Sequence, residues 1–155
     1  MTFQKTAPLL LALASTFLGP SAQARANGLQ RPLIDWVGSW TIGDEQTIDI
    51  SIEDGRELVI DGYATYGARD PARVAEGSVQ VAAFFARVTL DDVQDGNVIR
   101  FAFDGEEILP YEEPNEGLCK VELDLQGPLL RVHDNGRCGG ANASFTGVYS
   151  APFKK

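Results

Sequence analysis

The feature that most constrains the fold is a hairpin-like stretch bracketed by the two cysteines of the chain, Cys119 and Cys138. Within it, apolar residues alternate with polar ones on both sides of Gly127-Pro128, which is the pattern of two antiparallel strands joined by a tight turn. We expect these strands at 118–126 and 129–134. Because successive residues of a strand point to opposite faces, one face of the hairpin is apolar and the other is polar.

The length of the turn determines the register of this hairpin. If Gly127 and Pro128 form a two-residue turn, the numbers of facing residues sum to 255. The facing pairs are then Leu125 with Leu130, Leu123 with Val132, Asp124 with Arg131, and Glu122 with His133. Cys119 faces Gly136, and the bend at that glycine brings Cys138 within reach of a disulfide. In an exported protein such a pair is a structural bridge, so we predict one disulfide between the two cysteines.

A second hairpin shows the same alternation. Residues 47–53 alternate without a fault and place three isoleucines on one face. Asp54-Gly55-Arg56 then turns the chain, and 58–64 form the partner strand. With a three-residue loop Ile52 faces Leu58, so that the apolar faces of the two strands coincide.

Turn residues divide the rest of the chain into further short strands, which gives about eight in all. The expected strands are 38–42, 47–53, 58–64, 78–88, 97–103, 118–126, 129–134 and 143–150. Within the fourth of them, 82–88 is rich in alanine, and a short helix is the alternative there. The longest loops are expected at 66–77 and 110–117.

This strand pattern predicts an all-β fold, namely an antiparallel meander closed into a small barrel, with a two-sheet sandwich as the alternative. The segment Trp36-Val37-Gly38-Ser39-Trp40 is similar to the Gly-x-Trp start of the first strand in lipocalin-like and avidin-like barrels. That resemblance implies that an indole plugs one end of the barrel.

The first 24 residues are typical of a secretory signal peptide. Lys5 supplies the positive charge, and 7–18 form the apolar run. Ala22 and Ala24 then place small residues at the −3 and −1 positions of a cleavage site. An apolar run of this length is too short to span a membrane, which takes about 20 residues. We therefore expect a periplasmic or secreted protein with no membrane anchor.

Three segments follow from that assignment. They are a signal peptide at 1–24, a mobile N-terminal arm at 25–35 and a single β-barrel domain at 36–153. The chain carries 22 acidic and 13 basic residues, a net charge of −9. This balance argues against nucleic acid and anionic membranes as partners, because a protein binds phosphates by neutralising them. It favours a cationic partner, although an acidic surface also serves solubility alone.

The end of the chain carries the pattern Asp134-Asn135-x-x-Cys138-Gly139-Gly140-x-Asn142-x-x-Phe145-x-Gly147-x-Tyr149. It resembles the shared ending of a group of small exported bacterial proteins, over roughly the last 40 residues. The resemblance implies a fold and a compartment, and it transfers no catalytic residue.

Two explanations of this pattern stay open. Asn-Gly and Gly-Gly supply tight turns beside a disulfide, and Asn142 hydrogen-bonds the loop backbone. Alternatively, the amides of the Cys-Gly-Gly segment and a neighbouring arginine form a small pocket for an anion or a sugar hydroxyl. The candidate residues of such a pocket are Arg137, Gly139, Gly140 and Asn142.

The sequence offers few groups for catalysis. His133 is the only histidine, and both cysteines are expected in the disulfide, so a nucleophile activated by histidine is not expected. The histidine and the carboxylates do not have the spacing of metal ligands. Acidic pairs such as Asp91-Asp92 and Glu106-Glu107 lie in polar loops, where solvation explains them. We therefore expect a protein that is not an enzyme and that holds no cofactor and no metal.

Two functions remain. The first is a non-catalytic binding module of the bacterial envelope, such as a protein inhibitor, that presents Glu112, Glu113 and Glu116 to a cationic partner. Several periplasmic lysozyme inhibitors are small disulfide-bonded β-barrels, which is an analogy of fold and compartment. The alternative is a carrier that holds a small apolar ligand in the barrel interior. The residues expected to line that interior are Phe101, Phe103, Phe145 and Tyr149.

Overall fold

The computed structural model describes residues 33–94 and 97–151. The expected signal peptide at 1–24 and the arm up to residue 32 lie outside the described residues, so both stay predictions. The last three residues of the expected arm form a short 3-10 helix, η1 (Leu33–Asp35), in which Leu33 is buried.

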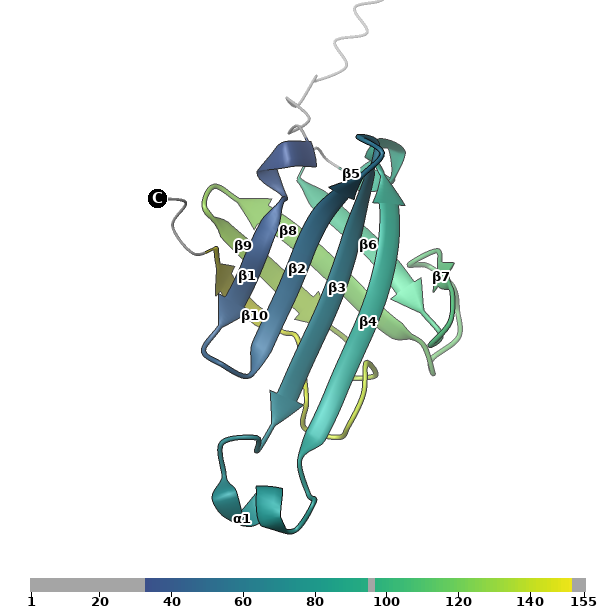
Figure 1. Cartoon of the computed structure of the whole chain (residues 1–155). Coiled ribbons are helices and arrows are strands. Elements are labelled where there is room, and N and C mark those ends of the chain that lie inside the picture. The colour runs from purple at the N-terminus through teal and green to yellow at the C-terminus, as the bar shows by residue number, and fades with distance from the viewer. Residues whose placement is uncertain (1–32, 95–96, 152–155) are drawn as a thin grey trace, which may run out of the picture.

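Ten strands form one antiparallel sheet (Figure 1). They are β1 (Gly38–Ile42), β2 (Gln46–Glu53), β3 (Glu57–Tyr66), β4 (Gln80–Thr89), β5 (Val93–Gln94), β6 (Val98–Phe103), β7 (Ile108–Leu109), β8 (Cys119–Gln126), β9 (Leu129–Asp134) and β10 (Gly147–Ser150). Their order across the sheet is β4-β3-β2-β1-β10-β9-β8-β6-β5, and β7 pairs with β6. The sheet curls until β4 and β6 approach each other, which makes a nearly closed barrel.

The predicted all-β meander is therefore confirmed, and the sandwich alternative is wrong, because the strands belong to one continuous sheet. Both predicted registers are also confirmed. Ile52 lies opposite Leu58 in the β2–β3 hairpin. In the β8–β9 hairpin Leu125 faces Leu130, and Glu122 faces His133.

The alanine-rich segment 82–88 belongs to strand β4, so the helical alternative is wrong. Ala82, Phe84, Ala86 and Val88 are buried, whereas the residues between them are exposed. The alternation is hidden in the sequence because the outward positions of this strand include alanine and phenylalanine. Ten consecutive pairs with β3 supply the hydrogen bonds that hold the segment extended.

The last predicted strand, 143–150, is shorter than expected, because only Gly147–Ser150 pair with a neighbour. The amide of Phe145 and the hydroxyl of Ser144 instead donate to the carboxylate of Asp134. A side chain thus replaces the neighbouring strand as the hydrogen-bond partner of this segment. The structure also contains a one-turn helix, α1 (Pro71–Ala75), in the loop expected at 66–77, and a 3-10 helix, η2 (Leu90–Asp92), after β4.

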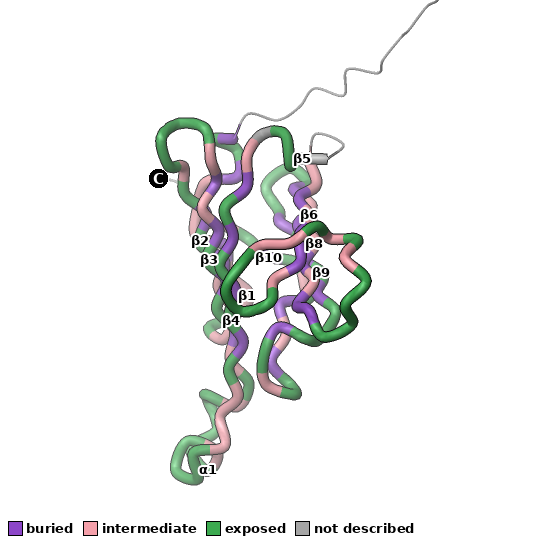
Figure 2. Tube along the Cα trace, turned by 90° about the vertical axis from the view of Figure 1, so that its right-hand side faces the viewer, coloured by how far each residue is buried: buried purple, intermediate pink, exposed green. Residues whose placement is uncertain are grey.

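Buried residues line the space between the two walls of the barrel (Figure 2). The Phe84 ring lies at its centre, 5.4 Å from the Phe101 ring and 4.6 Å from the Phe145 ring. Gly62 on the neighbouring strand β3 makes room for it, since a Cβ there would overlap the Phe84 ring. The tryptophans of the opening segment are buried too, and the Trp40 indole donates to the carbonyl of Trp36 at 2.9 Å.

Candidate functional site

A cleft opens in the barrel wall where β4 and β6 meet without pairing; we call it the seam cleft. Its volume is about 490 Å³, which is within the usual range of ligand-binding clefts. It is lined by Arg87, Val88, Asp91, Asp92, Arg100, Phe101 and residues 108–112. The wall is incomplete here because β6 carries only the two short strands β5 and β7 on the side that faces β4.

The two arginines of the seam cleft are already paired with carboxylates. Arg87 forms ion pairs with Glu53 and, at 3.5 Å, with Glu57, and its pKa is raised mainly by the hydrogen bond to Glu53. Arg100 donates from Nε to Glu122 at 2.6 Å. The cleft therefore does not present two free positive charges.

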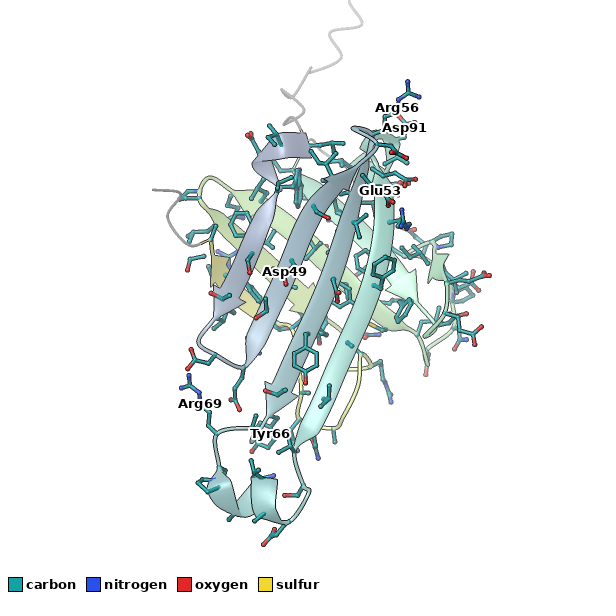
Figure 3. The ribbon with its side chains drawn as sticks, in the orientation of Figure 1. Asp49, Glu53, Arg56, Tyr66, Arg69 and Asp91 are labelled. Atoms are coloured by element: carbon teal, nitrogen blue, oxygen red, sulfur yellow. A yellow bond between two sulfur atoms is a disulfide. The ribbon has the colours of Figure 1, made fainter. Side chains whose placement is uncertain are left out.

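The carboxylates that line the seam cleft have fewer charged partners than its arginines. Asp92 accepts hydrogen bonds from the amide of Thr89 at 2.6 Å and from its hydroxyl at 2.9 Å. Asp91 and Glu112 are exposed and form no ion pair within the described part of the chain. Figure 3 shows Glu53, Arg56 and Asp91 at the same end of the barrel, where Glu53 and Arg56 line a neighbouring hollow. Carboxylates therefore outnumber basic side chains in the lining of the seam cleft and this hollow.

The three glutamates predicted to bind a partner lie in the loop that follows β7. Glu112 lines the seam cleft, whereas Glu113, which is half-buried, and Glu116, which is exposed, do not line it. Lys120 of β8 holds this loop in place. Its Nζ donates to the carbonyl of Glu113 at 2.8 Å and lies 5.6 Å from the centre of the Tyr111 ring. No ion pair involves any of the three carboxylates within the residues described.

The predicted disulfide is present, with the Cα atoms of Cys119 and Cys138 4.4 Å apart. Beside it, the buried carboxylate of Asp134 accepts hydrogen bonds from the amides of Gly136 and Phe145 and from the Ser144 hydroxyl. A buried carboxylate with this many donors is well satisfied, so it acts as a structural node.

The next residue of the pattern ties the same loop to β8. Asn135 Nδ2 donates to the carbonyl of Leu118 at 2.8 Å, and Oδ1 accepts from the amides of Lys120 and Arg137. All three hydrogen bonds of the Asn135 side chain go to backbone groups, as expected if the pattern serves to hold the loop in place.

The Gly-Gly segment closes the barrel next to the seam cleft. Gly139 bridges Ala82 of β4, and a Cβ on Gly139 would overlap the Cα of Ala82. The amide of Gly140 donates to the carbonyl of Val81 at 2.9 Å. Glycine is required at 139 because two backbones come into contact there.

The residues of the alternative anion or sugar pocket are only partly brought together. Arg137 and Gly139 line a hollow of about 210 Å³ beside the disulfide. The Asn142 side chain was expected to bond the loop backbone, but it donates at 3.1 Å to Gln80 Oε1, which also accepts from the Asn142 amide at 2.7 Å. The Gly140 amide already donates to Val81 and is not free to bind a ligand. Only Arg137 and Gly139 of the four candidate residues therefore line the hollow.

The end of the pattern is buried. The Tyr149 hydroxyl donates to the carbonyl of Phe145 at 2.8 Å, and burial, with a smaller contribution from the nearby Asp134 charge, raises the pKa of Tyr149. Gly147 allows the Ile42 side chain to pack closely, because a Cβ there would overlap it. Phe145 and Tyr149 thus belong to the core.

Of the groups considered for catalysis, the acidic pair Asp91-Asp92 lines the seam cleft, whereas the histidine does not. His133 is exposed on the outer face of β9, opposite Glu122. In the part of the chain that the structure describes, no group of three or more histidine, cysteine or acidic residues could hold a metal ion. None of the helices there is long and apolar enough to cross a membrane.

Comparison of the chain with protein-family models, with curated proteins and with solved structures finds no match. Sequence reasoning found the acidic loop but missed the seam cleft, because Arg87, Asp91 and Arg100 are brought together only by the curling of the sheet.

Proposed function

We propose that this chain is an exported, non-catalytic binding module of the bacterial envelope that captures a cationic protein, as a protein inhibitor does. The observation that carries this proposal is the surface around the seam cleft. There the arginines are paired with glutamates, while Asp91, Glu112 and the neighbouring loop glutamates have no basic partner among the described residues.

The packing of the interior favours binding on the outside. Phe101 and Phe145, which were expected to line a ligand cavity, both contact Phe84 and are buried. Tyr149 is buried as well and hydrogen-bonded to Phe145. The carrier function would need these aromatic rings to move apart, which their packing and the Tyr149 hydrogen bond oppose.

Two further observations support the envelope as the place of action. The first 24 residues have the composition of a signal peptide, and the disulfide is of a kind that persists in oxidising compartments. The net charge of −9 is compatible with steering a cationic partner toward the acidic end of the barrel.

Electrostatic capture makes a clear prediction about association. Exposed charges are screened over about 8 Å at physiological ionic strength, so the association rate should fall steeply as salt is added. Replacing Glu112, Glu113 and Glu116 by glutamine should slow association and leave stability within about 0.5 kcal/mol, because exposed charges contribute little to folding.

The test uses the chain without residues 1–24 as bait in an envelope extract, followed by association kinetics with the captured protein. The matched control is Asp49→Asn, Asp61→Asn and Glu76→Gln, which removes the same charge from exposed positions outside the seam cleft. We expect the wild type and this control to associate with the partner at similar rates, and the loop variant to associate more slowly and to capture less of it. Equal capture by all three proteins, or binding that is indifferent to salt, would contradict the proposal.

A further inference from the structure

Strand β4 ends the sheet, and only part of its outer edge is covered. On that edge the Gly139-Gly140 segment lies against Val81 and Ala82. Beyond this contact the edge continues along the seam cleft to Thr89. Natural proteins usually protect such an edge, because its unpaired N–H and C=O groups are a template for another strand.

Two hydrogen bonds identify the residues whose main-chain groups face the edge. The carbonyl of Val81 accepts from Gly140, and the amide of Thr89 donates to Asp92, so both residues point away from β3. In an antiparallel strand every second residue directs its N–H and C=O to the same side. Phe85 and Arg87 are in this phase, and among the described residues no strand or loop backbone pairs with them on this side.

Most side chains beside this edge are apolar and exposed, and the one charged side chain among the outward residues of β4, Arg87, is paired with Glu53 and Glu57. Phe85 is 45% exposed, Val81 is 44% exposed, and Tyr63 on the adjacent strand is 52% exposed. Tyr63 faces Ala83 across the β3–β4 pair, so these side chains lie on one outer face of the sheet. Apolar side chains next to an unpaired edge are the opposite of the charged residues that discourage edge pairing.

The charges around the edge indicate which kind of strand can pair with it. Asp91 and Glu112 line the seam cleft, and Glu53 and Glu57 outnumber the single Arg87 with which they pair. A second copy of this chain would bring a further net charge of −9 to the same place, which disfavours pairing of two β4 strands. A basic segment is the complementary partner.

We propose that the free edge of β4 at Phe85 and Arg87 binds an extended segment of the partner by strand addition, with lysine or arginine side chains that face the carboxylates of the seam cleft. This inference rests on the proposed function and specifies how the cationic partner is held. Main-chain hydrogen bonds supply affinity in this mode, and the side chains at alternate positions supply selectivity.

The probe is a short synthetic peptide in which lysine alternates with valine, tested beside a copy with N-methylated backbone amides and a copy with glutamate in place of lysine. Phe85→Pro removes the outward N–H without breaking a bond to β3, and proline is tolerated on edge strands. Phe85→Ala is its matched control, because it removes the ring and keeps the N–H. Circular dichroism and thermal unfolding verify that both variants fold.

We expect the lysine peptide to bind the wild type and Phe85→Ala, and to protect the amides of Phe85 and Arg87 from hydrogen exchange. Phe85→Pro should weaken binding about tenfold, the effect of one lost hydrogen bond, and methylation of several peptide amides should weaken it at least as much. The glutamate peptide should not bind.

The other outcomes are distinct. If the lysine peptide binds Phe85→Pro and the wild type equally and in a salt-dependent way, strand addition is wrong while electrostatic capture stands. If the peptide leaves the wild type unaffected while the envelope partner is captured, strand addition is again overturned. If neither cationic ligand binds, both proposals fail. Sedimentation as a dimer with protected Phe85 and Arg87 amides would instead assign the edge to a second copy.

Discussion

At the scale of single residues, the pattern that ends the chain is explained by hydrogen bonds and close packing. Asp134 gathers the donors of its loop, Asn135 fastens the loop to β8, and Gly139 lets the loop touch β4. The first two roles depend on both polar atoms of the side chain, and the third depends on the absence of a Cβ. A specific sequence pattern can therefore arise from closing a barrel, without a ligand.

The first prediction concerns Asp134, which is 6% exposed. Asp134→Asn keeps the shape of the side chain but turns one acceptor into a donor, which opposes the amides and the hydroxyl that now point at it. We expect the free energy of unfolding to fall by about 3 kcal/mol. Urea unfolding followed by fluorescence measures the change.

Asp49→Asn is the control for that experiment, because Asp49 is exposed on β2 and forms no ion pair among the described residues. It should change stability by less than about 0.5 kcal/mol. If the two variants have equal stability, Asp134 is not the structural node that its contacts indicate.

At the scale of elements, hairpins were predictable and loops were not. The β2–β3 and β8–β9 hairpins have short turns and strict alternation, so their registers follow from counting. The strand β4 could be placed only approximately, because Phe85 and Ala83 are apolar on its outer face. The seam cleft could not be predicted, since Arg87 and Arg100 meet across a gap between strands that do not pair.

The disulfide permits a second prediction. It joins residues 19 positions apart. Closing a loop of this length lowers the conformational entropy of the unfolded chain, which stabilises the folded state by about 3 kcal/mol. Reduction should therefore lower the midpoint of thermal unfolding, while β8 and β9 stay paired because their hairpin does not need the bridge. Calorimetry with and without reductant measures the shift.

The double variant Cys119→Ala and Cys138→Ala is the control for side effects of the reductant. It should reproduce the lower midpoint and show no further change when reductant is added. An unchanged midpoint on reduction would mean that the loop is already ordered in the unfolded chain.

The turn between β6 and β7 permits a third prediction, on pH. Asp104 accepts hydrogen bonds from the amides of Glu107 and Glu106 at 2.8 Å, which lower its pKa from the ordinary value of a carboxyl. A carboxyl whose pKa is lowered by folding contributes stability above its unfolded pKa of about 3.9, and this contribution is lost as pH falls through the folded pKa.

Asp104→Asn removes the charge and keeps an acceptor at the turn. The difference in stability between wild type and variant should be constant near neutral pH and should shrink as pH falls below about 4. Thermal unfolding of both proteins over that range measures it. A difference that does not depend on pH would show that the charge of Asp104 is irrelevant to the turn.

At the scale of the whole molecule, the wall of the barrel is sealed at one end of β4 and open at the other. Along one half of β4, the loop held by the disulfide seals the wall through Gly139 and Gly140. Along the other half, the wall stays open as the seam cleft, over a core that aromatic rings fill. An open edge over a filled interior favours a partner that binds from outside.

The last prediction tests whether the interior is filled. Phe84 contacts Phe101 and Phe145 at the centre of the barrel, so Phe84→Ala should leave a cavity and lower the free energy of unfolding by about 3–5 kcal/mol. Such an apolar cavity binds benzene, whereas a packed core does not. Saturating benzene should therefore raise the unfolding midpoint of the variant and leave that of the wild type unchanged. If Phe84→Ala does not fold, Phe84→Leu opens a smaller space for the same measurement. A wild type that benzene stabilises as strongly as it does the variant would show that the rings part readily, and the barrel would then be able to carry an apolar ligand.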